Sequence, residues 1–180
     1  MLFRSKYSLC GGLQAGIDTC DRSIDPLSCN PMRIALYQPE IAGNVGAILR
    51  LAACMSVGVD VVEPTGFVFS DARMKRAGMD YIDQAEMVRH SDWTAFHAQV
   101  GGRLILMTTK GAESLYDFAF QHDDVLMFGQ ESAGVPIDIA AVCDARLRIP
   151  IAASARSLNL SVSAGIAISE ALRQTGELPQ

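Results

Sequence analysis

Three segments of the chain combine glycine with asparagine, arginine or clustered serines, and these residue types bind ligands through side chains or exposed backbone groups. A glycine at the end of a strand lets backbone N–H and C=O groups approach a ligand closely. An arginine offers a planar fork of donors to a phosphate or a ribose. The segments are residues 39–50 (PEIAGNVGAILR), residues 127–136 (MFGQESAGVP) and residues 148–165 (RIPIAASARSLNLSVSAG).

The first two segments also have ordinary interpretations. In the first, Asn44 is a candidate N-cap for the helix that follows, and Arg50 falls on that helix. In the second, Gly129 follows a predicted strand, and Gly134 with Pro136 favours a turn. Taken alone, each segment fits a capped helix or a tight turn as well as it fits a ligand site.

The third segment is less ordinary. Four polar side chains crowd into eight positions, with apolar residues between them, and a long polar loop inside a compact domain is usually functional. The helix that follows is small on one side, which permits close packing of backbones. The four polar residues are Ser154, Ser157, Asn159 and Ser161.

Alternating strands and helices must position these segments. Such alternation, with β-branched runs, predicts an α/β fold in which helices cover both faces of a parallel sheet. A sheet of this kind binds ligands at the carboxyl ends of its strands. The predicted strands are Arg33–Tyr37, Val59–Val62, Leu104–Thr108, Val125–Phe128 and Ala145–Ile149; the predicted helices are Asn44–Met55, Trp93–Gln99, Ile137–Val142 and Ser161–Gln174.

The amino-acid composition limits the class of protein to which the chain can belong. Apolar residues make up 49% of the 180 residues and charged residues 19%, which is typical of a globular protein. Residues 1–31 have no clear period, so we expect a disordered extension or a misassigned start there, with one domain over residues 32–180. No apolar run approaches the roughly 20 residues of a membrane helix, and we expect a cytoplasmic protein. Cys54 lies in an apolar run and is expected in the core.

The sequence lacks the motifs of several common ligand-binding and catalytic sites. Neither GxGxxG nor GxxxxGK[ST] occurs, so the usual phosphate loops are missing. The histidines are scattered, with no HExxH and no cysteine–histidine zinc pattern, and we expect no metal. No GxSxG elbow occurs, which argues against a serine hydrolase. The net charge of −5 argues mildly against nucleic-acid binding, although the distribution of charge matters more than its sum.

Taken together and in order, the segments resemble the SPOUT superfamily of RNA 2'-O-methyltransferases, in particular the TrmL (YibK) type that methylates the wobble ribose of tRNA. The resemblance runs from Met32 to about Gly176 and does not cover residues 1–31. Val162 and Ser169 depart from it, because asparagine and, in some members, tyrosine stand there. The matching motifs are NxGxxxR at Asn44–Arg50, EPTGF at Glu63–Phe67, RAGMDY at Arg76–Tyr81, TTKG at Thr108–Gly111, MFGQESAGVP at Met127–Pro136 and RIP with SARSLNLSVS at Arg148–Ser163.

The resemblance implies a fold that spacing does not reveal. SPOUT proteins thread their C-terminal segment through a loop to form a deep trefoil knot, and they bind S-adenosyl-L-methionine within the knotted loops. They act as homodimers, and the substrate of this type is the anticodon loop of tRNA. The wobble nucleotide that would be methylated is C or U.

The resemblance also implies roles for individual residues. Arg50 is the first candidate for a catalytic arginine, and Arg156 is the second. Arg50 is expected to hold the neighbouring phosphate, and the ribose proton is expected to leave through that phosphate or through Arg50 itself. The first route is physically easier, because arginine stays protonated. The residues expected to bind the cofactor are Met107, Gly129, Ile149 and Ser157, and Asn159 is expected to fix its loop by side-chain to backbone hydrogen bonds.

Three further hypotheses accompany this assignment. Arg73, Lys75 and Arg76 are expected to contact the tRNA backbone, which would let an acidic protein bind RNA. The first alternative keeps the fold and replaces tRNA by ribosomal RNA. The second is a non-catalytic α/β module that binds RNA or a nucleotide, and the intact third segment argues against it.

Overall fold

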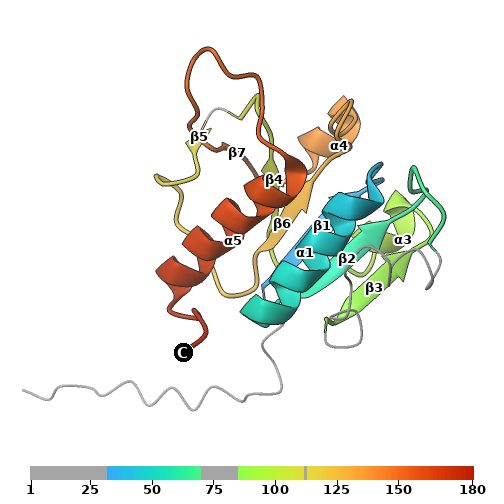
Figure 1. Cartoon of the computed structure of the whole chain (residues 1–180), viewed down its shortest axis with the longest axis horizontal. Helices are drawn as coiled ribbons and strands as arrows, with labels where there is room; N and C mark the ends of the chain where they lie inside the picture. The colour runs from blue at the N-terminus through green and yellow to red at the C-terminus, as the bar shows by residue number, and fades with distance from the viewer. Residues whose placement is uncertain (1–31, 70–84, 112) are drawn as a thin grey trace, which may run out of the picture.

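A computed structural model describes residues 32–69, 85–111 and 113–180 and shows one seven-stranded parallel sheet (Figure 1). The strand order is β3-β2-β1-β6-β4-β7-β5, and every neighbouring pair is parallel. The strands are β1 (Arg33–Tyr37), β2 (Gly58–Val62), β3 (Met87–His90), β4 (Leu104–Met107), β5 (Glu113–Ser114), β6 (Val125–Phe128) and β7 (Ala145–Arg148). The helices are α1 (Ala42–Met55), α3 (Trp93–His97), α4 (Ile137–Ala141) and α5 (Leu160–Thr175).

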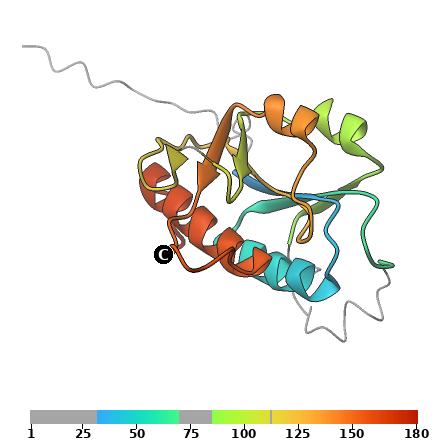
Figure 2. The same cartoon turned by 90° about the horizontal axis from the view of Figure 1, so that it is seen from above.

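Helices cover both faces of the sheet, as predicted. Figure 2 shows α1 and α5 side by side on one face and α3 and α4 on the other. Side chains alternate between the two layers along each strand. Ile34 and Leu36 of β1 therefore join the core beneath α1 and α5, whereas Ala35 and Tyr37 join the core beneath α3 and α4.

The sequence prediction located most elements within one or two residues. All five predicted strands and all four predicted helices are present. β3 and β5 were not predicted; both lie at edges of the sheet, and β5 has only 2 residues. The expectation for Cys54 was wrong, because it lies on the exposed side of α1.

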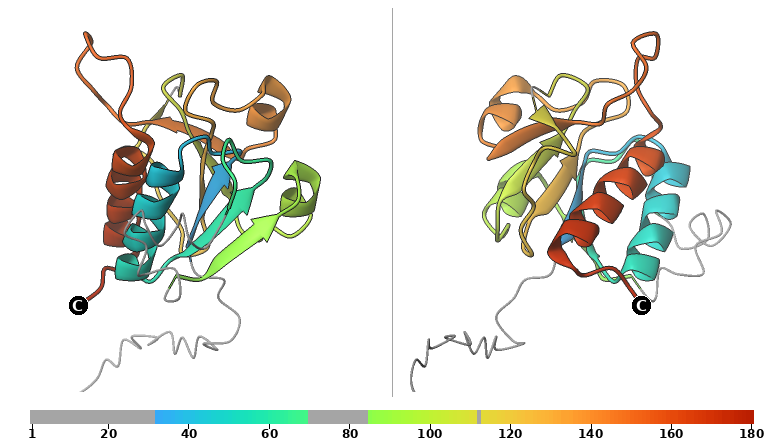
Figure 3. Two further views of the ribbon diagram at one scale, coloured as in Figure 1. Left: turned by 45° about the vertical axis from the view of Figure 1, so that its right-hand side comes forward. Right: turned by 90° about the vertical axis from the view of Figure 1, so that its left-hand side faces the viewer.

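The last connection arches away from the sheet before the chain returns as α5. Figure 3 shows this projecting loop above α5, and residues 150–159 are all exposed. We call residues 149–159 the arch. The parallel sheet with its two helical layers confirms the predicted fold class, and the threading of the C-terminal segment into a knot stays a prediction. Residues 1–31, with the expectation attached to them, lie outside the described residues.

A charged network crosses three strands on the side of the sheet away from the arch. The Arg33 Nε lies 2.6 Å from the Asp60 carboxylate, and the His90 Nε2 lies 2.8 Å from the same group. Arg33 also donates to Glu86 at 2.7 Å. Gly58 gives the arginine room, since a Cβ there would lie 2.2 Å from the guanidinium Nη1. Asp60 and His90 are buried, so these contacts are what makes their burial tolerable.

Candidate functional site

Three residues predicted to bind the cofactor lie together at the carboxyl ends of neighbouring strands. Met107 is the last residue of β4, and its register partners are Phe128 of β6 and Leu147 of β7. Gly129 follows Phe128 directly, and Ile149 comes two residues after Leu147. The carboxyl ends of three adjacent strands therefore bring Met107, Gly129 and Ile149 together, as expected for a ligand site in a parallel sheet.

Gly129 is required by a tight approach of backbone to backbone. A Cβ at this position would lie 2.4 Å from the carbonyl carbon of Gly134. Gln130 and Gly134 exchange two backbone hydrogen bonds of 2.9 Å, which fold residues 130–134 back beside the strand end. Gly134 itself adopts a φ of 74°, a conformation that favours glycine. The second motif is therefore a closed turn held directly against the end of β6.

Asn44 ties all three motif segments together. Its Nδ2 donates to Glu131 Oε1 at 2.9 Å, and its Oδ1 accepts from Asn159 Nδ2 at 3.0 Å. The residue is buried at the start of α1. The prediction that Asn44 caps α1 was wrong, because the helix begins at Ala42 after Ile41, and Ile41 makes no side-chain cap. The Asn44 side chain is instead used between loops.

A reciprocal pair of carboxylates fastens the first segment to the second. The Glu40 backbone N–H donates to Glu131 Oε2 at 2.8 Å, while the Ser132 N–H and hydroxyl each donate to Glu40 at 2.8 Å. The hydrogen bonds from Ser132 lower the pKa of Glu40 below its ordinary value. Glu40 is therefore ionised at neutral pH, and the contact persists there.

Asn159 fixes the start of α5, which confirms the expected side-chain to backbone bonds. Its Oδ1 accepts from the Ser161 N–H at 2.9 Å and from the Ser161 hydroxyl at 2.7 Å. Because its Nδ2 donates to Asn44, the same side chain caps α5 and links that helix to α1. The end of the arch is thereby anchored to the strand-end loops.

The remaining candidate residues are Arg50, Arg156 and Ser157. Arg50 lies on the exposed side of α1, six residues beyond Asn44. Arg156 and Ser157 lie in the exposed arch, and among the described residues neither side chain makes a hydrogen bond or an ion pair. The structure therefore places Met107, Gly129 and Ile149 at adjacent strand ends, and the roles of all six residues stay predictions.

Glu40, Glu131 and Ser132 are site residues that the sequence reasoning did not single out. All three belong to the first two motif segments, which lie at the ends of β1 and β6. Their position just after a strand was the signal that could have identified them. Arg73, Lys75 and Arg76 lie outside the described residues. Within the described ranges, no three His, Cys, Asp or Glu residues are grouped to hold a metal ion. No helix in the same ranges has the length and apolarity needed to cross a membrane.

We expect Asn44→Ala to weaken cofactor binding at least about tenfold, because Glu131 and Asn159 each lose the hydrogen bond with the buried Asn44 that joins their loops. Isothermal titration with S-adenosyl-L-methionine measures the loss. Asn44→Asp is the informative companion: its carboxylate still accepts from Asn159 but faces the Glu131 carboxylate, so it should bind no better than the alanine variant. Wild-type affinity in both variants would contradict a joining role for Asn44.

Comparisons with known proteins agree with this geometry. Residues 31–169 match the model of the SpoU rRNA Methylase family. A tRNA (cytidine(34)-2'-O)-methyltransferase from Beijerinckia indica is 49% identical over 148 residues, which cover 81% of this chain and 92% of that protein. The Escherichia coli K12 protein of the same name is 40% identical, with coverage of 81% and 94%.

Solved structures give the same result. A structure described as giving insights into the 2-OH methylation of C/U34 on tRNA superposes with a TM-score of 0.76 at 37% identity, covering 81% of this chain and 96% of that chain. The SpoU methyltransferase AviRb from Streptomyces viridochromogenes, in complex with AdoMet, has a TM-score of 0.71 at 25% identity, covering 83% of this chain and 62% of that chain. The strand-end site and these matches lead to one assignment: the chain belongs to the SpoU methylase family.

Proposed function

We propose that this protein transfers a methyl group from S-adenosyl-L-methionine to the ribose 2'-hydroxyl of the wobble nucleotide, C or U, of tRNA. The observation that carries the proposal is the meeting of Met107, Gly129 and Ile149 at adjacent strand ends. Relatives named for this reaction at position 34 are 40–49% identical to the chain and are covered over more than nine-tenths of their length.

The residues at the strand ends fit the cofactor. None of the hydrogen bonds among the described residues uses the backbone N–H of Gly129 or of Ile149, so both are available to an adenine or a carboxylate. Met107 is largely buried beside them and offers an apolar, polarisable surface. When bound, S-adenosyl-L-methionine supplies a methyl group already activated on a sulfonium. The protein then has to align the acceptor and exclude water.

The ribose hydroxyl must lose its proton as the new bond forms. Arg50 is proposed to hold a phosphate of the bound nucleotide, and the proton passes to that phosphate. Arginine cannot take the proton itself, because its guanidinium stays protonated in proteins. A bidentate grip fixes both the position and the orientation of the phosphate, which a lysine would not do.

Arg50→Lys should therefore lower kcat by about 10²-fold or more with little change in cofactor affinity, since misplacement by about 1 Å is enough for such a loss. Multiple-turnover methylation at saturating tRNA gives kcat, and titration with the cofactor gives the control. Full turnover by the lysine variant would contradict the bidentate role, and equal loss of both quantities would indicate a structural role for Arg50.

The working unit is proposed to be a homodimer that holds the anticodon loop of tRNA in the cytoplasm. Apolar side chains remain exposed on and beside the arch: Ile151 at 36%, Leu158 at 37% and Val162 at 50%. Val162 and the small residues near it lie on the first turns of α5. A second copy packed on this surface would bury them, and sedimentation of the full chain would measure the dimer.

Ribosomal RNA is the competing substrate, since the family model carries that description. The chain spans 57% of an AdoMet-bound rRNA methyltransferase from Sinorhizobium meliloti but more than nine-tenths of the tRNA relatives, which favours tRNA. Purified protein should methylate a tRNA pool at position 34, as mapped by mass spectrometry, and leave an rRNA pool unmodified. Methylation of rRNA alone would overturn the proposal, and cofactor binding without methylation of either pool would favour a binding module.

A further inference from the structure

Eight of the lysines and arginines in the described ranges, Arg50 aside, fall into two groups. Arg33, Arg89, Arg103 and Arg173 each form an ion pair with a carboxylate. Lys110, Arg146, Arg148 and Arg156 form no ion pair with another described residue. All four are exposed, and they belong to β7, to the loop after β4 or to the arch. These four cations therefore lie on or next to β7 in the chain or in the fold.

Two of these cations lie on one face of β7. Arg146 and Arg148 are two residues apart on a strand, so their side chains point to the same face about 7 Å apart. Arg146 is in register with Leu106, which packs into the core beneath α3 and α4. The central strands β2, β4 and β6 are buried along their whole length, whereas β7 leaves both arginines exposed.

Neighbouring acids form no ion pair with these two arginines among the described residues. Glu113 of β5 is in register with Leu147, so it points to the opposite face from the two arginines. Asp144 accepts a hydrogen bond of 2.7 Å from the Leu104 N–H at the start of β4. Ser114 is the register partner of Arg148 and brings no charge.

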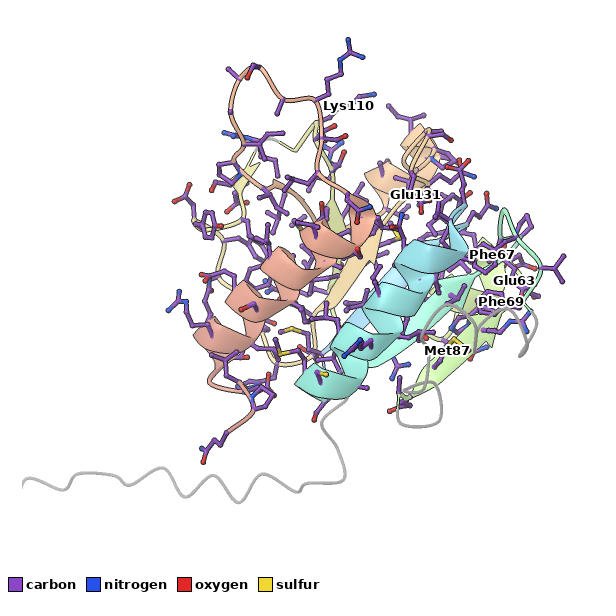
Figure 4. All side chains as sticks on the ribbon, viewed as in Figure 1. Glu63, Phe67, Phe69, Met87, Lys110 and Glu131 are labelled. Carbon is purple, nitrogen blue, oxygen red and sulfur yellow. The ribbon has the colours of Figure 1, made fainter. Side chains whose placement is uncertain are left out.

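Lys110 lies in the loop that follows β4 and runs beside β7. Its loop is held against β7 by a 2.8 Å hydrogen bond from the Thr108 N–H to the Leu147 carbonyl. Figure 4 shows Lys110 at the end of the molecule where the arch projects. The loop follows Met107 directly, and Arg148 precedes Ile149, so both cations flank residues of the proposed cofactor site.

We propose that Arg146, Arg148 and Lys110 form a phosphate-binding surface that holds the sugar–phosphate backbone of the RNA beside the methyl donor. This inference rests on the proposed function. The methyl group would be transferred at the carboxyl ends of β4, β6 and β7. The acceptor ribose must therefore reach these strand ends together with its flanking phosphates. Arginines in an exposed row suit a chain of phosphates, and such contacts position RNA without reading its sequence. The competing explanation is that the charges only keep the start of β7, which the short edge strand β5 does not cover, from pairing with another chain.

The test compares the salt dependence of tRNA binding in the full chain and in Arg146→Gln/Arg148→Gln. Each lost phosphate contact should reduce the slope of log K against log salt by about 0.7–0.9, so the double variant should lose about 1.4–1.8. Arg173→Gln removes a charge at the far end of α5 and should keep the wild-type slope. Cofactor affinity should stay unchanged in all variants.

Several outcomes would overturn the inference. An unchanged slope in the double variant, with normal tRNA methylation by the wild type, would leave the proposed function intact and favour edge protection or a different partner. Loss of cofactor affinity together with the slope would show that the arginines act on the site loops instead. If the double variant does not fold, Lys110→Gln in its exposed loop should still reduce the slope by about 0.7–0.9, and no change there would refute the surface. If the wild type binds no tRNA, the proposed function fails first and this inference fails with it.

Discussion

Replacing Gly129 by alanine is expected to abolish measurable binding of S-adenosyl-L-methionine and to lower the free energy of unfolding by about 1–3 kcal/mol. The added methyl group would lie 2.4 Å from the carbonyl carbon and 2.7 Å from the Cα of Gly134. Both atoms belong to the backbone of a closed turn, so no side chain can rotate away. The turn must move from the end of β6, and the N–H offered to the cofactor moves with it.

A second glycine provides the matched control for this change. Gly43 lies in the first turn of α1 near the same loops, and a Cβ there would meet nothing within 4 Å. Gly43→Ala should keep cofactor affinity and raise the free energy of unfolding by up to about 1 kcal/mol, as alanine favours a helix. Titration calorimetry and urea unfolding measure both quantities. Cofactor binding by the Gly129 variant as tight as that of the Gly43 variant would show that the turn does not hold the ligand.

The main strands and helices could be predicted because their sequence patterns are local. β4 and β6 are continuous apolar runs and β1 is one after Arg33, which is typical of parallel strands buried on both faces. β3 escaped prediction because two of its four residues are exposed, and its run is not continuously apolar. β5 is too short to carry a pattern, and it is a strand only because β7 pairs with it.

The candidate site was predictable only where it depends on strand ends. Gly129 could be placed because a glycine at the carboxyl end of a predicted strand has a position that the sequence reveals, whereas Met107 was expected there only from the family resemblance. The contacts of Asn44 could not be predicted, since its partners Glu131 and Asn159 lie 87 and 115 residues away in the sequence. An asparagine near the start of a helix suits an N-cap as well as a bridge between loops, and only the fold decides between these uses.

Removing the carboxylate of Asp60 should have the largest effect on stability. Asp60→Ala leaves Arg33 with only the exposed Glu86 and leaves the buried His90 without its hydrogen-bond partner. Breaking a buried ion pair from one side costs about 3–5 kcal/mol, because the remaining charge stays desolvated. Urea unfolding of the variant measures this change.

Glu86 provides the contrast within the same network. Its side chain is 66% exposed, so Glu86→Gln should change the free energy of unfolding by no more than about 1 kcal/mol. The network spans β1, β2 and β3, which form one half of the strand order. The proposed cofactor site lies at β6, β4 and β7 in the other half. Folded Asp60→Ala protein at low temperature should therefore bind the cofactor with normal affinity. A loss no greater than that of Glu86→Gln would mean that Asp60 contributes little to stability, and a loss of cofactor affinity in the folded variant would mean that the two halves of the sheet are coupled.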